Sequence, residues 1–211
     1  MEEENSQTIK IIKDISNFGK LLKNNEILYG SSIIMNDINK QLTIIKWIEE
    51  KINKNNIFMK LIFKMSVNGD TGEDFHKYCD NQGPTLILIQ TTNNKTFGGF
   101  TPLNWKKVDN DNLMDVNNQT FIFSVDLNKK YNFIICFNMR DINKTAIKHS
   151  KENGPIFGAE DIQLKKNLRE GMCYADGSCN FSSNNQIELL GDSGSSKSFV
   201  TKELEVFKVN Y

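Results

Sequence analysis

The chain has 211 residues and carries 26 Lys or Arg against 26 Asp or Glu, so its formal net charge is zero. This length suits one β-rich domain with a small appendage. Balanced charge without a basic cluster excludes the usual electrostatic basis of nucleic-acid binding. The acidic start is unlike a secretory leader, and no apolar run approaches the roughly 18 residues that a membrane span needs. We therefore expect a cytoplasmic protein without membrane insertion.

Residues 1–30 are predicted to form an N-terminal amphipathic helix and a linker. Apolar residues recur at helical spacing along this stretch, namely Ile11, Ile15, Phe18 and Leu22. This apolar stripe is too short for an independent coiled coil. The helix is therefore expected to pack on the domain or to fray in part. The domain proper is then residues 31–211, and removal of residues 1–28 should leave it folded.

A second helix is predicted to begin near Asn36 or Asp37, because either side chain can cap it. Its expected apolar face consists of Ile38, Leu42, Ile45, Ile48 and Ile52. After residue 56 the apolar period changes to alternation, which predicts a half-buried strand over residues 59–65.

A short helix ending near Cys79 is predicted next, because Thr71 and Asp74 have the spacing of a capping box. Gly83 and Pro84 end it and lead into a strand over residues 85–91. Asn93-Asn94 predicts a hairpin turn with a return strand over residues 97–100. Further strands are predicted over residues 120–127, 133–137, 161–164 and 200–209. The short connections between strands require antiparallel pairing.

Several short motifs follow one another along these elements. They are Ser66-x-x-Gly69, a helix with Phe75 and Cys79, Gly83-Pro84-Thr85-Leu86, Phe97-Gly98-Gly99-Phe100 before Trp105, Gly154-Pro155-x-Phe157-Gly158 before Asp161, and Glu203-Leu204-Glu205-Val206-Phe207. Their order and spacing resemble a TLDc domain over roughly residues 31–211. Ser32-Ile33-Ile34 followed by Trp47 resembles the segment that precedes the core in many relatives.

The resemblance implies an α+β fold in which two antiparallel β-sheets pack as a sandwich with flanking helices. It also implies a cytosolic protein of a class associated with resistance to oxidative stress and, in several members, with binding to the vacuolar proton-pumping ATPase. No cofactor is implied. The family-motif residues are expected to be mostly structural: Gly69, Phe75, Gly83, Pro84, Gly98, Gly99, Trp105, Phe157, Gly158, Asp161, Glu203 and Glu205. The chain departs from the family pattern at Ala159-Glu160, where glycines are usual.

Four cysteines offer the candidates for thiol chemistry. His76 and Cys79 are three residues apart on a helix and could form a thiolate and base pair. The structural interpretation is favoured, because buried cysteines are common in cores, a surface His is usually solvated, and Asp80 is expected to point away. Cys173 and Cys179 flank a turn and are the candidate redox thiols. We expect this pair to react before Cys79 and Cys136, and no metal site, because further soft ligands are absent nearby.

Two other patterns are suggestive of chemistry. Gly191-Asp192-Ser193-Gly194 spells the nucleophile motif of serine proteases, but the triad partners are missing and the segment is predicted to be a turn. Glu203 and Glu205 share one face of a strand, where paired carboxylates can share a proton or bind a cation. Their alternation with apolar residues favours a solvated strand face instead.

These observations predict a monomeric interaction module without catalysis, whose partner is a protein. Subunits of the vacuolar proton-pumping ATPase are the candidate partner that the resemblance implies. The alternative is a weak thiol-dependent antioxidant enzyme or hydrolase. A third hypothesis is that the N-terminal helix binds the partner and that the globular part only presents this helix.

Overall fold

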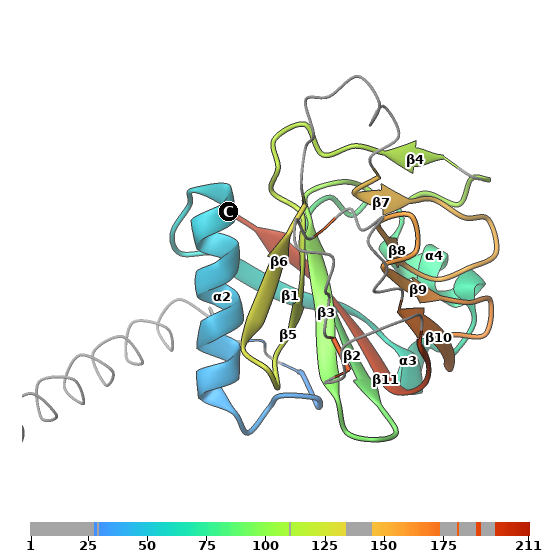
Figure 1. Cartoon of the computed structure of the whole chain (residues 1–211), viewed down its shortest axis with the longest axis horizontal. Coiled ribbons are helices and arrows are strands. Elements are labelled where there is room, and N and C mark those ends of the chain that lie inside the picture. Colours follow the sequence, from blue (N-terminus) through green and yellow to red (C-terminus); the bar gives the residue numbers. More distant parts are fainter. Residues whose placement is uncertain are drawn as a thin grey trace, which may run out of the picture.

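The computed structural model describes residues 28, 30–109, 111–133, 145–173, 181, 189–190 and 197–211. The predicted N-terminal helix, the Gly191-Asp192-Ser193-Gly194 segment, Cys136 and Cys179 lie outside these residues. Strands dominate the described part, and Figure 1 shows them with one long helix on one side. None of the described helices has both the length and the apolar character required to cross a membrane.

The described helices are α2 (Ile38–Ile52), α3 (Met65–Asn68) and α4 (Gly72–Cys79). The first strands are β1 (Phe58–Lys64), β2 (Thr85–Thr91), β3 (Thr96–Thr101), β4 (Asn112–Leu113), β5 (Phe121–Ser124) and β6 (Lys129–Asn132). The later strands are β7 (Ile147–Lys148), β8 (Ile156–Phe157), β9 (Ile162–Leu164), β10 (Glu170–Cys173) and β11 (Lys197–Asn210).

All of these strands form one antiparallel sheet, in the order β4-β7-β8-β9-β10-β11-β2-β3-β5-β6, with β1 also paired to β11. The reason is the length of β11. Its first residues, Lys197–Val200, pair with β10, whereas residues from Thr201 to Lys208 pair with β2. A register shift between Thr201 and Glu203 interrupts the ladder between these parts, and such irregularities bend a strand. The hydrogen bonding is therefore continuous, and the predicted sandwich of two sheets is not confirmed.

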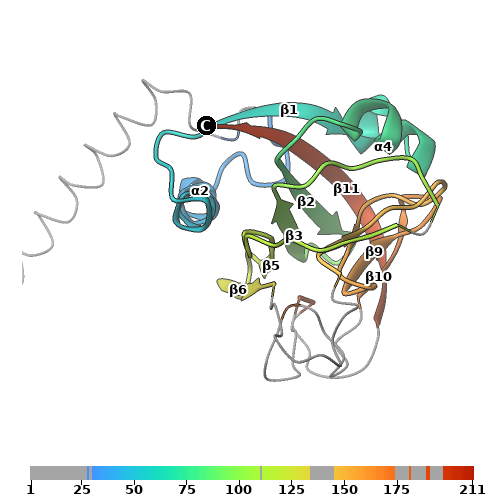
Figure 2. The ribbon, with the colours of Figure 1, turned by 90° about the horizontal axis from the view of Figure 1, so that it is seen from above.

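Strands β11, β2, β3 and β5 have an apolar core on each face. On one face lie α4 and strands β7 to β9, with Phe75, Trp105 and Phe157 at the centre. On the other face lies α2, packed over Leu88 and Phe207. Figure 2 shows α2 and α4 on opposite sides of these strands. Because both faces are covered, these strands are buried on both sides.

Helix α2 begins where the sequence predicts. The Asp37 side chain accepts a hydrogen bond from the Lys40 amide, which satisfies one unpaired N–H at the helix start. Asn53 ends the helix in a left-handed conformation. Its buried face consists of Gln41, Ile44, Ile45, Ile48 and Ile52. The predicted members Ile38 and Leu42 are only partly buried, so the stripe is rotated slightly from the expected one.

Helix α4 confirms the predicted capping box. Thr71 Oγ1 accepts from the Asp74 amide, and the Asp74 carboxylate accepts from the Thr71 amide at 3.1 Å. The strand predicted over residues 120–127 is shorter than expected: β5 stops at Ser124 and a turn with Asn128 at positive φ leads into β6. The strand predicted over residues 133–137 falls mostly on residues outside the described ranges.

Candidate functional site

Cys173, one of the two candidate redox thiols, is buried at the end of β10 with 7% exposure. Burial raises the pKa of its thiol far above the usual value, and the Asp161 carboxylate raises the pKa further. A thiol that stays protonated is a weak nucleophile. Cys173 is the last residue of β10 and is buried, so the accessibility expected of a reactive thiol is not found there. Cys179 lies outside the described residues.

Cys79 and His76 are both buried, so the expected solvated His76 is also wrong. Cys79 has no exposed surface. Its burial, and to a smaller extent the negative charge of Asp80, raise the pKa of its thiol well above the usual value. His76 is only 5% exposed, because the chain near Asn153 covers it.

The His76 ring is fixed at both nitrogens. Nδ1 lies 2.7 Å from Oδ1 of Asp80, and Nε2 lies 3.0 Å from the carbonyl oxygen of Asn153. The expectation that Asp80 points away is wrong, because residues four apart lie on the same face of a helix. Both nitrogens are thus engaged by oxygen atoms, and the ring ties α4 to the loop that contains Asn153.

Glu203 and Glu205 are buried, which overturns the expected solvated strand face. Glu205 has no exposed surface and Glu203 has 8%. The Glu205 carboxylate accepts hydrogen bonds from Ser31 and Ser32, and the Glu203 carboxylate accepts one from the Ser66 amide. The alternation of acidic and apolar residues is misleading here, because the segment before α2 covers Glu205 and α3 lies against Glu203.

The other family-motif residues shape turns or fill the core on the face of the sheet that α4 covers. Gly69, Gly83 and Gly158 adopt positive φ angles, which favour glycine. The indole N–H of Trp105 donates to Thr85 Oγ1 at 2.9 Å, and its ring packs between Phe75 and Phe157. The remaining members are Pro84, whose carbonyl accepts from the Val209 amide, buried Asp161, and Gly98 and Gly99 within β3.

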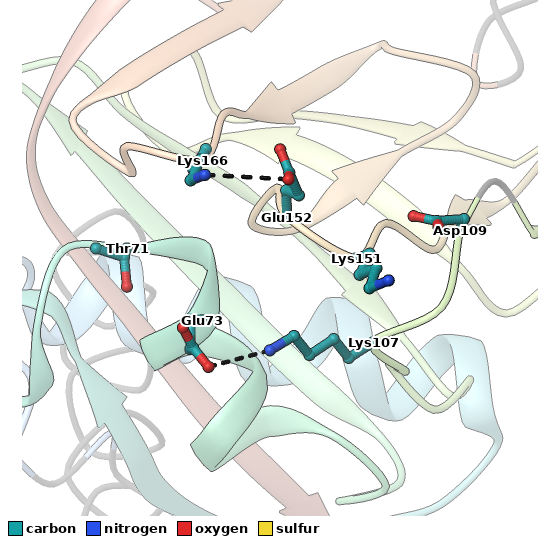
Figure 3. Close-up of a pocket in the computed structure, with 7 residues that line it drawn as sticks. All are labelled: Thr71, Glu73, Lys107, Asp109, Lys151, Glu152 and Lys166. Atoms are coloured by element: carbon teal, nitrogen blue, oxygen red, sulfur yellow. Dashed lines mark hydrogen bonds and ion pairs between the residues drawn. The ribbon is translucent and has the colours of Figure 1, made fainter.

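A groove of about 460 Å³ lies beside α4. We call it the charged groove. Three lysines, three carboxylates and one hydroxyl line it: Lys107, Lys151, Lys166, Glu73, Asp109, Glu152 and Thr71. Figure 3 shows Lys107 reaching toward Glu73 of α4 and Lys166 reaching toward Glu152. The Lys107 Nζ is 3.1 Å from Glu73 Oε1, and the Lys166 Nζ is 4.0 Å from Glu152 Oε1.

The backbone around the charged groove is fixed by α4. Asp80 accepts from the Lys107 amide at 2.8 Å through the carboxylate oxygen that His76 does not use. The same His76 and Asp80 pair therefore positions the loops on two sides of the groove. Gly72 lets the backbone of Glu152 approach α4 closely, because a side chain at this position would overlap the Glu152 carbonyl.

His149 adds a second tie between these loops. Its Nε2 lies 2.9 Å from the Asn104 carbonyl oxygen, and its Nδ1 lies 3.3 Å from Asp111 Oδ2. The charged tips above this framework remain in solvent: the Lys107 and Glu73 side chains are 41% and 80% exposed. Exposed pairs of this kind contribute at most about 1 kcal/mol, so an incoming charged group can exchange for either partner at little cost.

No sequence pattern predicts the charged groove. Its lining comes from four separate segments, and each lysine taken alone reads as an ordinary surface residue. No three His, Cys, Asp or Glu side chains of the described residues are grouped so that they could hold a metal ion. The exposed charges of the groove can therefore recognise a charged group, and the loops that carry them are held in place.

A protein-family model of the TLDc domain matches residues 28–210. The chain belongs to the TLDc domain family. The match spans the whole sheet and α2, and it begins at Leu28, which is buried in the core beneath α2. No curated protein sequence matches this TLDc chain.

Proposed function

We propose that this TLDc chain is a monomeric cytoplasmic interaction module without catalysis, and that a protein partner docks at the charged groove. The observation that carries the proposal is the groove itself, in which solvent-exposed charges of both signs stand on a framework fixed by His76 and Asp80. Complementary charges give protein contacts their specificity and their speed of association. A polar, open hollow of this kind suits a protein surface better than an apolar small molecule.

Family membership supports the vacuolar proton-pumping ATPase as the partner, and resistance to oxidative stress as the setting in which it acts. The chain itself supplies the charges and the preformed loops that a reversible contact needs. The N-terminal helix predicted from the sequence is the other candidate for the partner-binding element.

The thiol-dependent alternative has less support among the described residues. Cys79 and Cys173 are buried with raised thiol pKa values, and both nitrogens of His76 are engaged by other groups. Peroxide consumption by the purified chain, lost in a Cys79→Ser or Cys173→Ser variant, would favour the enzyme.

Binding to the purified vacuolar proton-pumping ATPase tests the proposal. The chain is titrated onto the immobilised ATPase, and ATP-driven proton pumping is followed in parallel. We expect saturable binding that weakens with added salt, because exposed charges are screened. A Lys107→Glu and Lys166→Glu double variant should bind about tenfold more weakly, a loss of roughly 1.4 kcal/mol.

The matched control is Lys202→Glu, which makes the same kind of charge reversal on an exposed β11 residue outside the groove. Equal binding by the double variant and the wild type would reject the groove as the docking site. Absence of any binding by the wild-type chain would reject this ATPase as the partner.

A further inference from the structure

The carboxylate of Glu205, outside the charged groove, is buried and bonded at both oxygens. It has no exposed surface and lies near the middle of β11. Ser31 Oγ donates to Oε2 at 2.6 Å, while the Ser32 amide and Ser32 Oγ donate to Oε1 at 2.7 and 2.9 Å. The Lys64 ammonium lies 3.5 Å from Oε1. The carboxylate thus binds two serines that are more than 170 residues away in the sequence.

This contact holds the irregular segment that enters α2. Leu28 and Ile34 of the segment are 2% and 3% exposed and belong to the core beneath α2. The Gln41 side chain provides the other polar tie: it accepts from the Leu28 amide and donates to the Ile34 carbonyl. If the bonds to Glu205 are lost, the Gln41 tie and the apolar contacts of Leu28 and Ile34 remain to hold the described part of the segment.

The two serines differ in their access to solvent. Ser31 is 1% exposed, whereas Ser32 is exposed at the surface with its hydroxyl directed at Glu205. Ser32 also lies in a bend outside any helix or strand. An exposed serine on an irregular segment is accessible to a modifying enzyme after a small local opening.

We infer that Ser32 is a phosphorylation site and that Ser32 and Glu205 form a latch which phosphorylation opens. In the reaction a kinase transfers the terminal phosphoryl group of a nucleoside triphosphate to Ser32 Oγ. The new Oγ–P bond forms as the bond to the leaving nucleoside diphosphate breaks, and the hydroxyl proton passes to the base of the kinase. The inference does not rest on the charged groove or on the identity of its partner.

Electrostatics gives the direction of the effect. The hydroxyl that donates to Glu205 is replaced by a group that carries about 1.5 to 2 negative charges at neutral pH and only accepts hydrogen bonds. Glu205 cannot turn to solvent, because it is enclosed on β11. The Lys64 ammonium already faces Glu205, so this positive charge would have to serve two anions. Repulsion at a buried carboxylate should therefore displace residues 30–34 from the sheet.

The test uses the full chain with phosphoserine incorporated at position 32 during translation. Amide hydrogen exchange is compared with that of the unmodified chain. We expect the amides of Ser32 and Ile34 to exchange about tenfold faster or more, while those of β2 and β3 keep their rates. The matched control carries phosphoserine in place of Thr92, an exposed turn residue, and should show no change in residues 30–34.

A second comparison separates repulsion from simple loss of the serine hydroxyl. In a Glu205→Gln background the phosphate should accelerate exchange much less, because the buried charge is gone. Unchanged or slower exchange in the phosphorylated wild-type chain would mean that Lys64 captures the phosphate and tightens the segment, and it would overturn the latch.

The site itself is tested with cytosol from the cells that make the protein. The purified chain is incubated with this cytosol and a nucleoside triphosphate labelled in its terminal phosphate, and peptides are mapped. Label on Ser32 is expected. Label confined to other residues would overturn the assignment of Ser32 as the modified position.

Discussion

The ring of Phe157 occupies the space that a side chain on Gly99 would need. A Cβ atom at Gly99 would come within 2.6 Å of Cζ of Phe157, closer than real Cβ atoms approach other groups. Gly99 belongs to β3 and Phe157 to β8, so this contact joins the central strands to the strands that fold over them. The glycine therefore sets how closely β8 can approach β3.

Substitution of the β3 glycines should destabilise the fold. Gly99→Val forces the valine against Phe157, and Gly98→Val forces it against the backbone of Ile87. Each should cost about 2 to 3 kcal/mol of unfolding free energy. Thermal melting of the purified variants measures this. Gly83→Ala is the control, because no atom lies within 4 Å of its Cβ position and only the strain of a φ of +81° remains, about 1 kcal/mol. Unchanged midpoints for both valine variants would show that β3 can shift to accept a side chain.

Local signals predicted the local structure well. The capping box at Thr71 and Asp74, the cap at Asp37 and the hairpin between β2 and β3 all follow from interactions among residues close in the chain. Each of these features depends on a few neighbouring residues, so a single sequence contains the information needed to place it.

The exposure of charged and titratable residues could not be predicted in the same way. Glu205 is buried because α2 and the segment before it cover one face of β11, which is a property of the folded chain. The same applies to His76, which is covered by the loop at Asn153. The single sheet likewise arises because β11 pairs first with β10 and then with β2. The residues of β11 contain no pattern that predicts this change of pairing partner. The charged groove depends on loops whose mutual positions are set by such long-range contacts.

Removing the Asp80 carboxylate should loosen the charged groove. Asp80→Ala deprives both the His76 ring and the Lys107 amide of their acceptor, which should cost about 1 to 3 kcal/mol. Melting and amide exchange at Lys107 report the two effects. Asp70→Ala is the control, because it removes an exposed ion pair with Arg169 and should cost less than about 1 kcal/mol. If the two variants behave alike, the groove is held by other contacts.

Truncation should separate the N-terminal region from the domain at Leu28. A chain that starts at Leu28 should melt close to the full chain, because it keeps the core contacts of Leu28 and the bonds from Ser31 and Ser32 to Glu205. A chain that starts at Met35 loses all of these and should be destabilised by several kcal/mol, with the Glu205 carboxylate left buried without its donors. Circular dichroism and melting compare them. A collapse of the chain that starts at Leu28 would mean that residues 1–27 contribute to the core.

Thiol reactivity decides between the interaction module and the thiol-dependent alternative. Cys79 and Cys173 are buried with raised pKa values, so alkylation at neutral pH should be slow in the folded chain and fast after unfolding. Peptide mapping after a timed exposure to the reagent distinguishes the four cysteines. Rapid labelling of Cys173 in the folded chain, at the rate of a small free thiol, would contradict its burial and favour the redox hypothesis.

The same raised pKa values predict how stability depends on pH. In the unfolded chain the thiols ionise near their usual value of 9.0, whereas in the folded chain they stay protonated to higher pH. Below pH 9 both states hold the protons and the stabilisation is fully present. Above it the unfolded state loses protons first, so the unfolding free energy falls as pH rises. Chemical denaturation between neutral pH and pH 10 should show this decline, and a Cys173→Ala variant should show a smaller one. An equal slope in the variant would mean that Cys173 ionises alike in both states, and it would contradict the raised pKa of its thiol.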